Sequence, residues 1–197
     1  PDFFEANWRP NASRPTFIFI GTLCGQKGVQ DCVAAFRDPR LSRARLEIFG
    51  SGDSQYVKAL QAVSSPNVEW KGRQAREAVI RSMEQASGLI LPTRADTSPN
   101  VVKEARVLGL PVITSPQGGQ VAYLKNSEDG FLVPAKDIEN LVTAIEQLNQ
   151  SPSLTMRMGE LGRLRYREKF LPSRTADAFL NLYETSLQGI PAPPKRR

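Results

Sequence analysis

One lysine lies in a glycine-rich segment that follows an apolar run and precedes a helical pattern. The segment runs from Gly21 to Gly28, with Lys27 near its end. Glycines permit a tight turn, and the amides that open the following helix can point toward a bound phosphate. The segment is not a Walker A loop, because Gln26 precedes the lysine and a glycine follows it. It indicates phosphate binding, with a plain turn and a solvated lysine as the open alternative.

Two carboxylates flank the expected start of a later helix. Asp96 lies in the preceding loop and Glu104 about a turn and a half inside the helix. Ser98 is the expected N-cap and Pro99 the first helical residue, which leaves free amides near Asn100 and Val101. Carboxylates at this spacing can reach two parts of one extended ligand, such as hydroxyls on separate sugar rings. Taken singly, each carboxylate is also explained as a loop residue or an ordinary helix charge.

Two further turns follow apolar runs. Gly50 to Gly52 reads GxG but lacks the third glycine of a dinucleotide fingerprint, because Gln55 stands there. A tight turn with Asp53 as a helix N-cap explains it equally well. The paired glycines that end Ser115 to Gly119 permit either close backbone approach or a flexible connection.

These loops alternate with short apolar runs and helical patterns. The expected strands are Thr16–Ile20, Leu46–Phe49, Val68–Trp70, Gly88–Leu91, Pro111–Thr114 and Phe131–Val133. The expected helices are Gly28–Phe36, Tyr56–Val63, Ala75–Ala86, Pro99–Leu108 and Ile138–Leu148. The alternation predicts an α/β fold, a Rossmann-like doubly wound parallel sheet with apolar strands covered on both faces. Ligands of such sheets bind outside the carboxyl ends of the strands, where the four loops lie.

The chain divides into three expected parts. Residues 1–15 carry three prolines and are interpreted as a linker from a preceding domain. Residues 16–187 form the Rossmann-like domain, with extra C-terminal helices from Ser151 onward and a break at Pro172. Residues 188–197 are an expected solvated tail, rich in proline and ending in basic residues.

The composition excludes several kinds of protein. The chain has 197 residues, 40% hydrophobic and 23% charged, which is typical of a globular protein with a real core. No apolar run approaches the about 20 residues of a membrane-spanning helix. Histidine is absent, so Ser-His-Asp triads and histidine zinc sites are excluded. Cys24 and Cys32 are expected to be free thiols. The net charge of +6 is spread along the chain, which favours a solvated surface over nucleic-acid binding.

In this order, the segments resemble the C-terminal, donor-binding half of a GT-B glycosyltransferase of the large retaining family four. The resemblance runs from about Thr16 to Leu187 and rests on the ordered set FIFIGTLCGQKGV, LEIFGSGD, VEWKG, Leu91 to Ala105, GLPVITSPQGG and DGFLVPAKDIENLVTAIEQL. It implies a retaining hexosyltransferase that uses a UDP- or GDP-sugar in glycan or polysaccharide biosynthesis. It also implies a cytoplasmic protein that needs no metal or other cofactor.

The resemblance implies a role for each matching position. Lys27 would bind the donor diphosphate, and Thr22, after Gly21, stands where the family usually carries an arginine. Asp96 would contact the donor sugar in place of a glutamate, and Glu104 would contact the ribose, so Lys27, Asp96 and Glu104 are the expected catalytic residues. The expected lining of the sugar and phosphates is Thr97, Ser98, Pro99, Asn100 and Val101, and the expected surroundings of the base are Lys71, Gly72 and Arg73.

The resemblance also implies that part of the enzyme lies outside this chain. The acceptor, a sugar or a lipid-linked glycan, would bind to a missing N-terminal domain, and a lipid-linked acceptor would place the enzyme at the inner membrane face. This chain alone is therefore expected to bind nucleotide without turnover. The alternatives are a degenerate nucleotide-binding or scaffold domain, another GT-B activity such as a nucleotide-sugar epimerase or a phosphorylase, and a nucleic-acid-binding domain.

Overall fold

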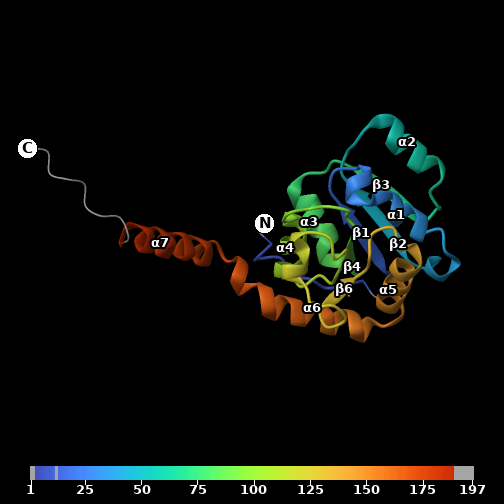
Figure 1. Cartoon of the computed structure of the whole chain (residues 1–197). Helices are drawn as coiled ribbons and strands as arrows, with labels where there is room; N and C mark the ends of the chain where they lie inside the picture. Colours follow the sequence, from blue (N-terminus) through green and yellow to red (C-terminus); the bar gives the residue numbers. More distant parts are fainter. Residues whose placement is uncertain (1–2, 12, 189–197) are drawn as a thin grey trace, which may run out of the picture.

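The computed structural model describes residues 3–11 and 13–188, in which a six-stranded parallel sheet lies between helices (Figure 1). The strands, in the sheet order β3-β2-β1-β4-β5-β6, are β1 (Thr16–Ile20), β2 (Arg45–Phe49), β3 (Val68–Gly72), β4 (Gly88–Leu91), β5 (Val112–Thr114) and β6 (Gly130–Leu132). The helices are α1 (Val29–Ala35), α2 (Ser54–Ala62), α3 (Arg76–Gln85), α4 (Asn100–Leu108), α5 (Ile138–Gln150), α6 (Pro152–Tyr166) and α7 (Pro172–Gln188). The predicted Rossmann-like fold is confirmed.

Side-chain caps fix the starts of two helices where the sequence predicts them. The Asp53 carboxylate accepts a hydrogen bond from the Tyr56 amide at 2.9 Å, and α2 begins directly after Asp53. The Ser151 hydroxyl accepts from the Leu154 amide at 3.3 Å and opens α6. Each cap pairs an amide that has no partner inside the helix, so both predicted starts are confirmed.

The start of α4 differs from the sequence prediction. Pro99 is the N-cap residue and Asn100 begins the helix, so Ser98 is not a cap. The reason lies in tertiary contacts, because the Ser98 hydroxyl bonds to the Tyr123 hydroxyl at 3.1 Å. The Ser98 amide donates to the Asp96 carboxylate at 3.2 Å, so both the hydroxyl and the amide of Ser98 are engaged outside the helix.

Helices cover the central strands on both faces. On one face of the sheet, Phe17 of β1 contacts the Phe36 ring edge-on, with 6.3 Å between the ring centroids. Leu148 of α5 packs against Gly88 on the same face. The central strands β1, β4 and β5 are almost fully buried, and their apolar runs reflect that burial.

The expectation of two apolar faces is wrong for β2 and β3. Their residues Arg45, Glu47, Glu69 and Lys71 lie on one face of the sheet and are only half buried. They pair with one another, with 3.1 Å between Lys71 Nζ and the Glu47 carboxylate and 2.8 Å between Lys71 Nζ and the Glu69 carboxylate. A cavity of about 690 Å³ opens over these charges and is lined also by Arg14 and Arg81.

The first described residues lie along the domain instead of standing apart from it. Phe3, Ala6 and Trp8 are buried. The Trp8 indole donates to the Ala86 carbonyl at 2.8 Å, and the Arg9 amide donates to the Glu84 carbonyl at 2.7 Å. The segment interpreted as a linker thus packs against the end of α3.

A buried ion pair joins α4 to the turn before β6. The Arg106 guanidinium lies 3.1 Å from the Asp129 carboxylate, and neither side chain has any exposed surface. Arg106 also donates to the Asp129 carbonyl at 2.7 Å. Arg165 of α6 holds the other carboxylate oxygen at 2.7 Å. Burial lowers the pKa of Arg106 to about 10, so the guanidinium remains charged at neutral pH.

Gly162 of α6 provides the space for this guanidinium. A Cβ atom at Gly162 would overlap the Arg106 terminal nitrogens. Glycine to alanine inside a helix normally stabilises a protein by up to about 1 kcal/mol. Here we expect Gly162→Ala to lower the melting temperature, because the buried guanidinium must shift. Thermal unfolding of Gly162→Ala beside Glu160→Ala, at an exposed position of α6, tests this, and a rise in Tm for Gly162→Ala would contradict the packing.

The last described helix, α7, extends away from the sheet (Figure 1). It exposes Phe179, Leu180, Leu182 and Tyr183 at 60 to 68% of their surface. The rest of the expected tail, residues 189–197, lies outside the described residues. Within the described part of the chain, no helix combines the length and the apolar character needed to cross a membrane.

Candidate functional site

Three loops enclose a cleft of about 620 Å³ at the carboxyl edge of the sheet. The loops follow β1, β4 and β5, and we call this cavity the central cleft. Its charged lining consists of Lys27, Arg94 and Asp96. The remaining lining residues are Gln26, Ala95, Thr97, Gln117, Gly118 and Gly119. The position agrees with the general rule for ligands of parallel sheets.

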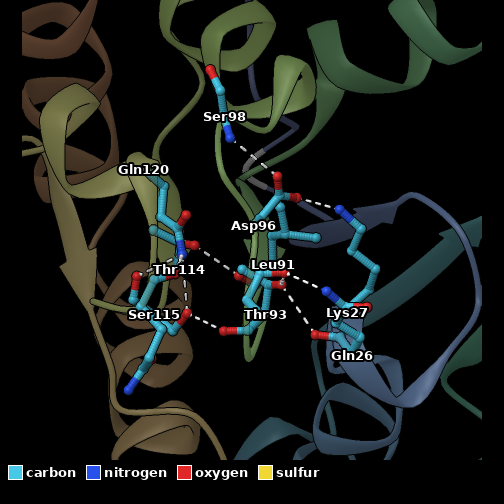
Figure 2. Close-up of polar contacts among 11 residues, drawn as sticks. Gln26, Lys27, Leu91, Thr93, Asp96, Ser98, Thr114, Ser115 and Gln120 are labelled. Atoms are coloured by element: carbon cyan, nitrogen blue, oxygen red, sulfur yellow. Dashed lines mark hydrogen bonds and ion pairs between the residues drawn. The ribbon is translucent and has the colours of Figure 1, made fainter.

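Lys27 and Asp96 meet in this cleft as an ion pair (Figure 2). The side chain of Asp96 is only 11% exposed and that of Lys27 is 28% exposed. The second oxygen of Asp96 accepts from the Ser98 amide. Partial burial strengthens such a pair relative to a surface pair. An anion that entered the cleft would therefore compete with Asp96 for Lys27.

Hydrogen bonds from polar side chains to backbone carbonyls link the three loops beneath the cleft (Figure 2). The Thr93 hydroxyl donates to the Gln26 carbonyl at 3.1 Å, and the Ser115 hydroxyl donates to the Thr93 carbonyl. The side-chain amide nitrogen Nε2 of Gln120 donates to the Ser115 carbonyl at 3.0 Å. Thr93, Ser115 and Gln120 are fully buried, so these bonds fix the loops relative to one another. The sequence did not predict this role, although Ser115 directly follows β5 and Thr93 lies two residues after β4.

The paired glycines after β5 bring two loops into backbone contact. The Gly119 amide donates to the Asp96 carbonyl at 3.0 Å. A Cβ atom at Gly118 would overlap the Asp96 carbonyl, and one at Gly119 would overlap the Thr97 carbonyl. Gly118 also has a φ of +107°, which favours glycine. Of the two interpretations of these glycines, close backbone approach is confirmed.

A second hollow of about 410 Å³ lies at the ends of β1, β2 and β3. Gly21 and Thr22 line it together with Arg73 and Gln74, whereas Lys71 pairs with Glu47 on the face of the sheet. The remaining lining residues are Ile20, Phe49, Gly50, Ser51 and Val79. The loop after β1 thus contributes Thr22 to this hollow and Lys27 to the central cleft. Gly72 ends β3 with a φ of +66°.

Glu104 lies apart from the Lys27–Asp96 pair. Its carboxylate is 3.6 Å from the Arg76 guanidinium of α3, and it lines neither the central cleft nor the second hollow. Burial raises the pKa of Glu104, and the Arg76 charge only partly opposes this. Asn100 and Val101 occupy the first turn of α4, four and three residues before Glu104. The structure therefore brings Lys27, Asp96 and Thr97 together and leaves Glu104 in a separate environment.

The raised pKa of Glu104 predicts a pH-dependent stability cost. The carboxylate is disfavoured in the folded state, so raising the pH above its unfolded-state pKa, near 4.5, reduces the free energy of unfolding. Glu104→Gln removes this cost. We expect the Tm of Glu104→Gln to exceed that of the unmodified chain by a few degrees at pH 7 and to match it at pH 4. Glu160→Gln, at an exposed helical position, is the control, and an equal difference at both pH values would contradict the assignment.

Metal-binding side chains do not gather in the part of the chain that the structure describes. No group of three or more cysteine, aspartate or glutamate side chains there could hold an ion. Cys24 and Cys32 are both free, and burial raises the pKa of Cys32.

The fold is a Rossmann-like α/β sheet, and its loops form a cleft at the carboxyl edge. The sequence pattern of the glycosyl transferases group 1 family matches residues 14–151, and the chain belongs to this family. The O-antigen chain mannosyltransferase C of Escherichia coli is 25% identical over 188 residues, which cover 93% of this chain and 50% of that protein. This chain thus spans about half the length of the curated relatives it matches.

Solved structures share the fold. HepE from Anabaena, in complex with UDP and glucose, superposes with a TM-score of 0.83 at 15% identity, over 94% of this chain and 55% of that chain. The C-terminal domain of a glycosyl transferase group 1 family protein from Francisella tularensis superposes with a TM-score of 0.71 at 14% identity. That match covers 83% of this chain and 94% of the Francisella chain. At these identities the likeness establishes the fold.

Proposed function

We propose that this chain is the C-terminal, donor-binding half of a retaining glycosyltransferase that uses a nucleotide sugar in glycan or polysaccharide biosynthesis. The observation that carries the proposal is the meeting of Lys27 and Asp96 in the central cleft. A cation and a carboxylate side by side match a donor with a diphosphate next to sugar hydroxyls. The size of the matching Francisella domain and the 50% coverage of the Escherichia coli relative support the assignment to one half.

The two cavities suit the two ends of such a donor. Lys27 would leave Asp96 for the diphosphate, and Asp96 would then accept hydrogen bonds from sugar hydroxyls. The backbone amides of Thr97, Asn100 and Val101, together with the positive dipole potential at the start of α4, would act on the leaving diphosphate. The second hollow, with Thr22 and Arg73, would hold the nucleoside.

Stabilising the leaving diphosphate in this way needs neither a histidine nor a metal from this chain. A preorganised cation and helix amides act on the charge that develops in the transition state, without proton transfer. We therefore propose a cofactor-independent site. The groups that bind the acceptor would come from the other half, so this chain alone would bind the donor and would not transfer the sugar.

Calorimetric titration of this chain with UDP, GDP and ADP, and then with the matching sugar nucleotides, tests the proposal. We expect one base to bind selectively and Lys27→Ala to weaken binding, whereas Glu104→Ala should leave binding unchanged, because Glu104 lines neither cavity. Circular dichroism of each variant checks that it is folded. Binding of none of the nucleotides, by a folded chain, would contradict a donor site that is complete within this half and would favour a scaffold function.

A further inference from the structure

Arg94 connects the loop that carries Lys27 to the loop that carries Asp96. Its guanidinium lies 3.0 Å from the Asp31 carboxylate of α1 and donates to the Gly25 carbonyl. Its backbone amide donates to the Gln26 carbonyl at 2.7 Å. Arg94, two residues before Asp96, therefore hydrogen-bonds to the two residues that precede Lys27.

Asp31 is the buried anchor of this connection. Its side chain is only 7% exposed, and a carboxylate in such a position requires a charged or hydrogen-bonding partner. Arg94 supplies the charge, and the Lys136 amide donates to the other oxygen at 3.3 Å. Lys136 belongs to the segment between β6 and α5 and has a φ of +71°, in the left-handed region. Asp31 thus contacts both Arg94 and the segment between β6 and α5.

We propose that Arg94 is a positioning residue that, through Asp31 and Gly25, sets the separation between Lys27 and Asp96. The proposal rests on the proposed donor site, in which these two side chains bind the diphosphate and the sugar of one ligand. Both terminal nitrogens of the guanidinium already donate hydrogen bonds, one to Asp31 and one to Gly25. This favours a positioning role for Arg94 over a direct contact with phosphate. Without Arg94, the loops of Lys27 and Asp96 would keep the Lys27–Asp96 ion pair but would lose the guanidinium contacts to Asp31 and Gly25.

The proposal makes Arg94 and Asp31 one functional unit. We expect Arg94→Gln and Asp31→Asn each to raise the Kd for the sugar nucleotide about 10-fold, and the double variant to raise it no further. The Kd for the nucleoside diphosphate should rise less, because it does not require Lys27 and Asp96 to act together. Arg94→Lys retains the ion pair with Asp31, so it should recover part of the affinity.

Calorimetric titration with UDP, GDP, UDP-glucose and GDP-mannose, with the Tm of each variant, separates the outcomes. If Arg94→Gln weakens binding and Asp31→Asn does not, Arg94 contacts the phosphate directly and the positioning role is wrong. If both variants lower the Tm but leave every Kd unchanged, the pair serves stability only and the proposal is overturned. If the unmodified chain binds none of UDP, GDP, ADP and their sugar nucleotides, the proposed donor site itself fails, and this inference fails with it.

Discussion

Replacing Lys27 by alanine is expected to weaken nucleoside diphosphate binding to this chain by about 10- to 150-fold. A hydrogen bond to a charged group contributes about 1.5 to 3 kcal/mol, which corresponds to that range of Kd. The upper part of the range is expected, because Asp96 would lose its partner and remain as an uncompensated negative charge beside the phosphates. Calorimetric titration with UDP and GDP measures the effect.

Two further variants separate the contribution of the lysine from that of the unpaired carboxylate. Lys58→Ala removes an exposed lysine from α2 and should leave the Kd unchanged. Lys27→Ala with Asp96→Ala should bind nucleoside diphosphate more tightly than Lys27→Ala alone, because the repulsion is gone. A Lys27→Ala variant with unchanged affinity would show that the diphosphate binds elsewhere.

The largest effect on stability is expected from Arg106→Met. Removing one partner of a fully buried ion pair costs about 3 to 5 kcal/mol, because the other charge stays buried. Arg165 still contacts Asp129, so the lower end of the range is expected. For a domain of this size, the loss corresponds to a fall in Tm on the order of 10 °C. Thermal and denaturant unfolding of the same variant measure it.

The buried charge on Asp129 provides the critical comparison. Asp129→Asn removes that charge, so adding it to Arg106→Met should recover part of the lost stability. Arg81→Met, at an exposed position of α3, should change the free energy of unfolding by less than about 0.5 kcal/mol. A fall for Arg106→Met no larger than that for Arg81→Met would show that the pair contributes nothing to stability.

Elements that are buried on both faces could be predicted closely from the sequence. The apolar run at Thr16–Ile20 has the same bounds as β1, because continuous burial leaves a continuous apolar signal. The charged face of β2 and β3 was not predicted, although charged and apolar residues alternate there, with Leu46 between Arg45 and Glu47 and Trp70 between Glu69 and Lys71. The burial of Arg106 was not predictable, because its partner Asp129 is 23 residues away in the chain.

The candidate site, like the fold, could be predicted from the sequence only in part. The rule that ligands bind at the carboxyl ends of parallel strands predicts, from the sequence alone, that Lys27 and Asp96 lie at one edge of the sheet. Their mutual pairing, and the pairing of Glu104 with Arg76, depend on how α3, α4 and the loops pack. The roles of Thr93 and Gln120 depend on hydrogen bonds between loops that are distant in sequence. No local pattern encodes these contacts.

The charged face of β2 and β3 has a consequence for the behaviour of the protein in solution. β3 is an edge of the sheet, and an edge strand offers its free backbone groups to the strands of other molecules. A strand that added to β3 would place its side chains beside Glu69 and Lys71, which already pair with Arg45 and Glu47. Covering these ions would remove water from them without providing new partners. We therefore expect the ion network to oppose the addition of further strands at β3, which would limit aggregation through this edge of the sheet.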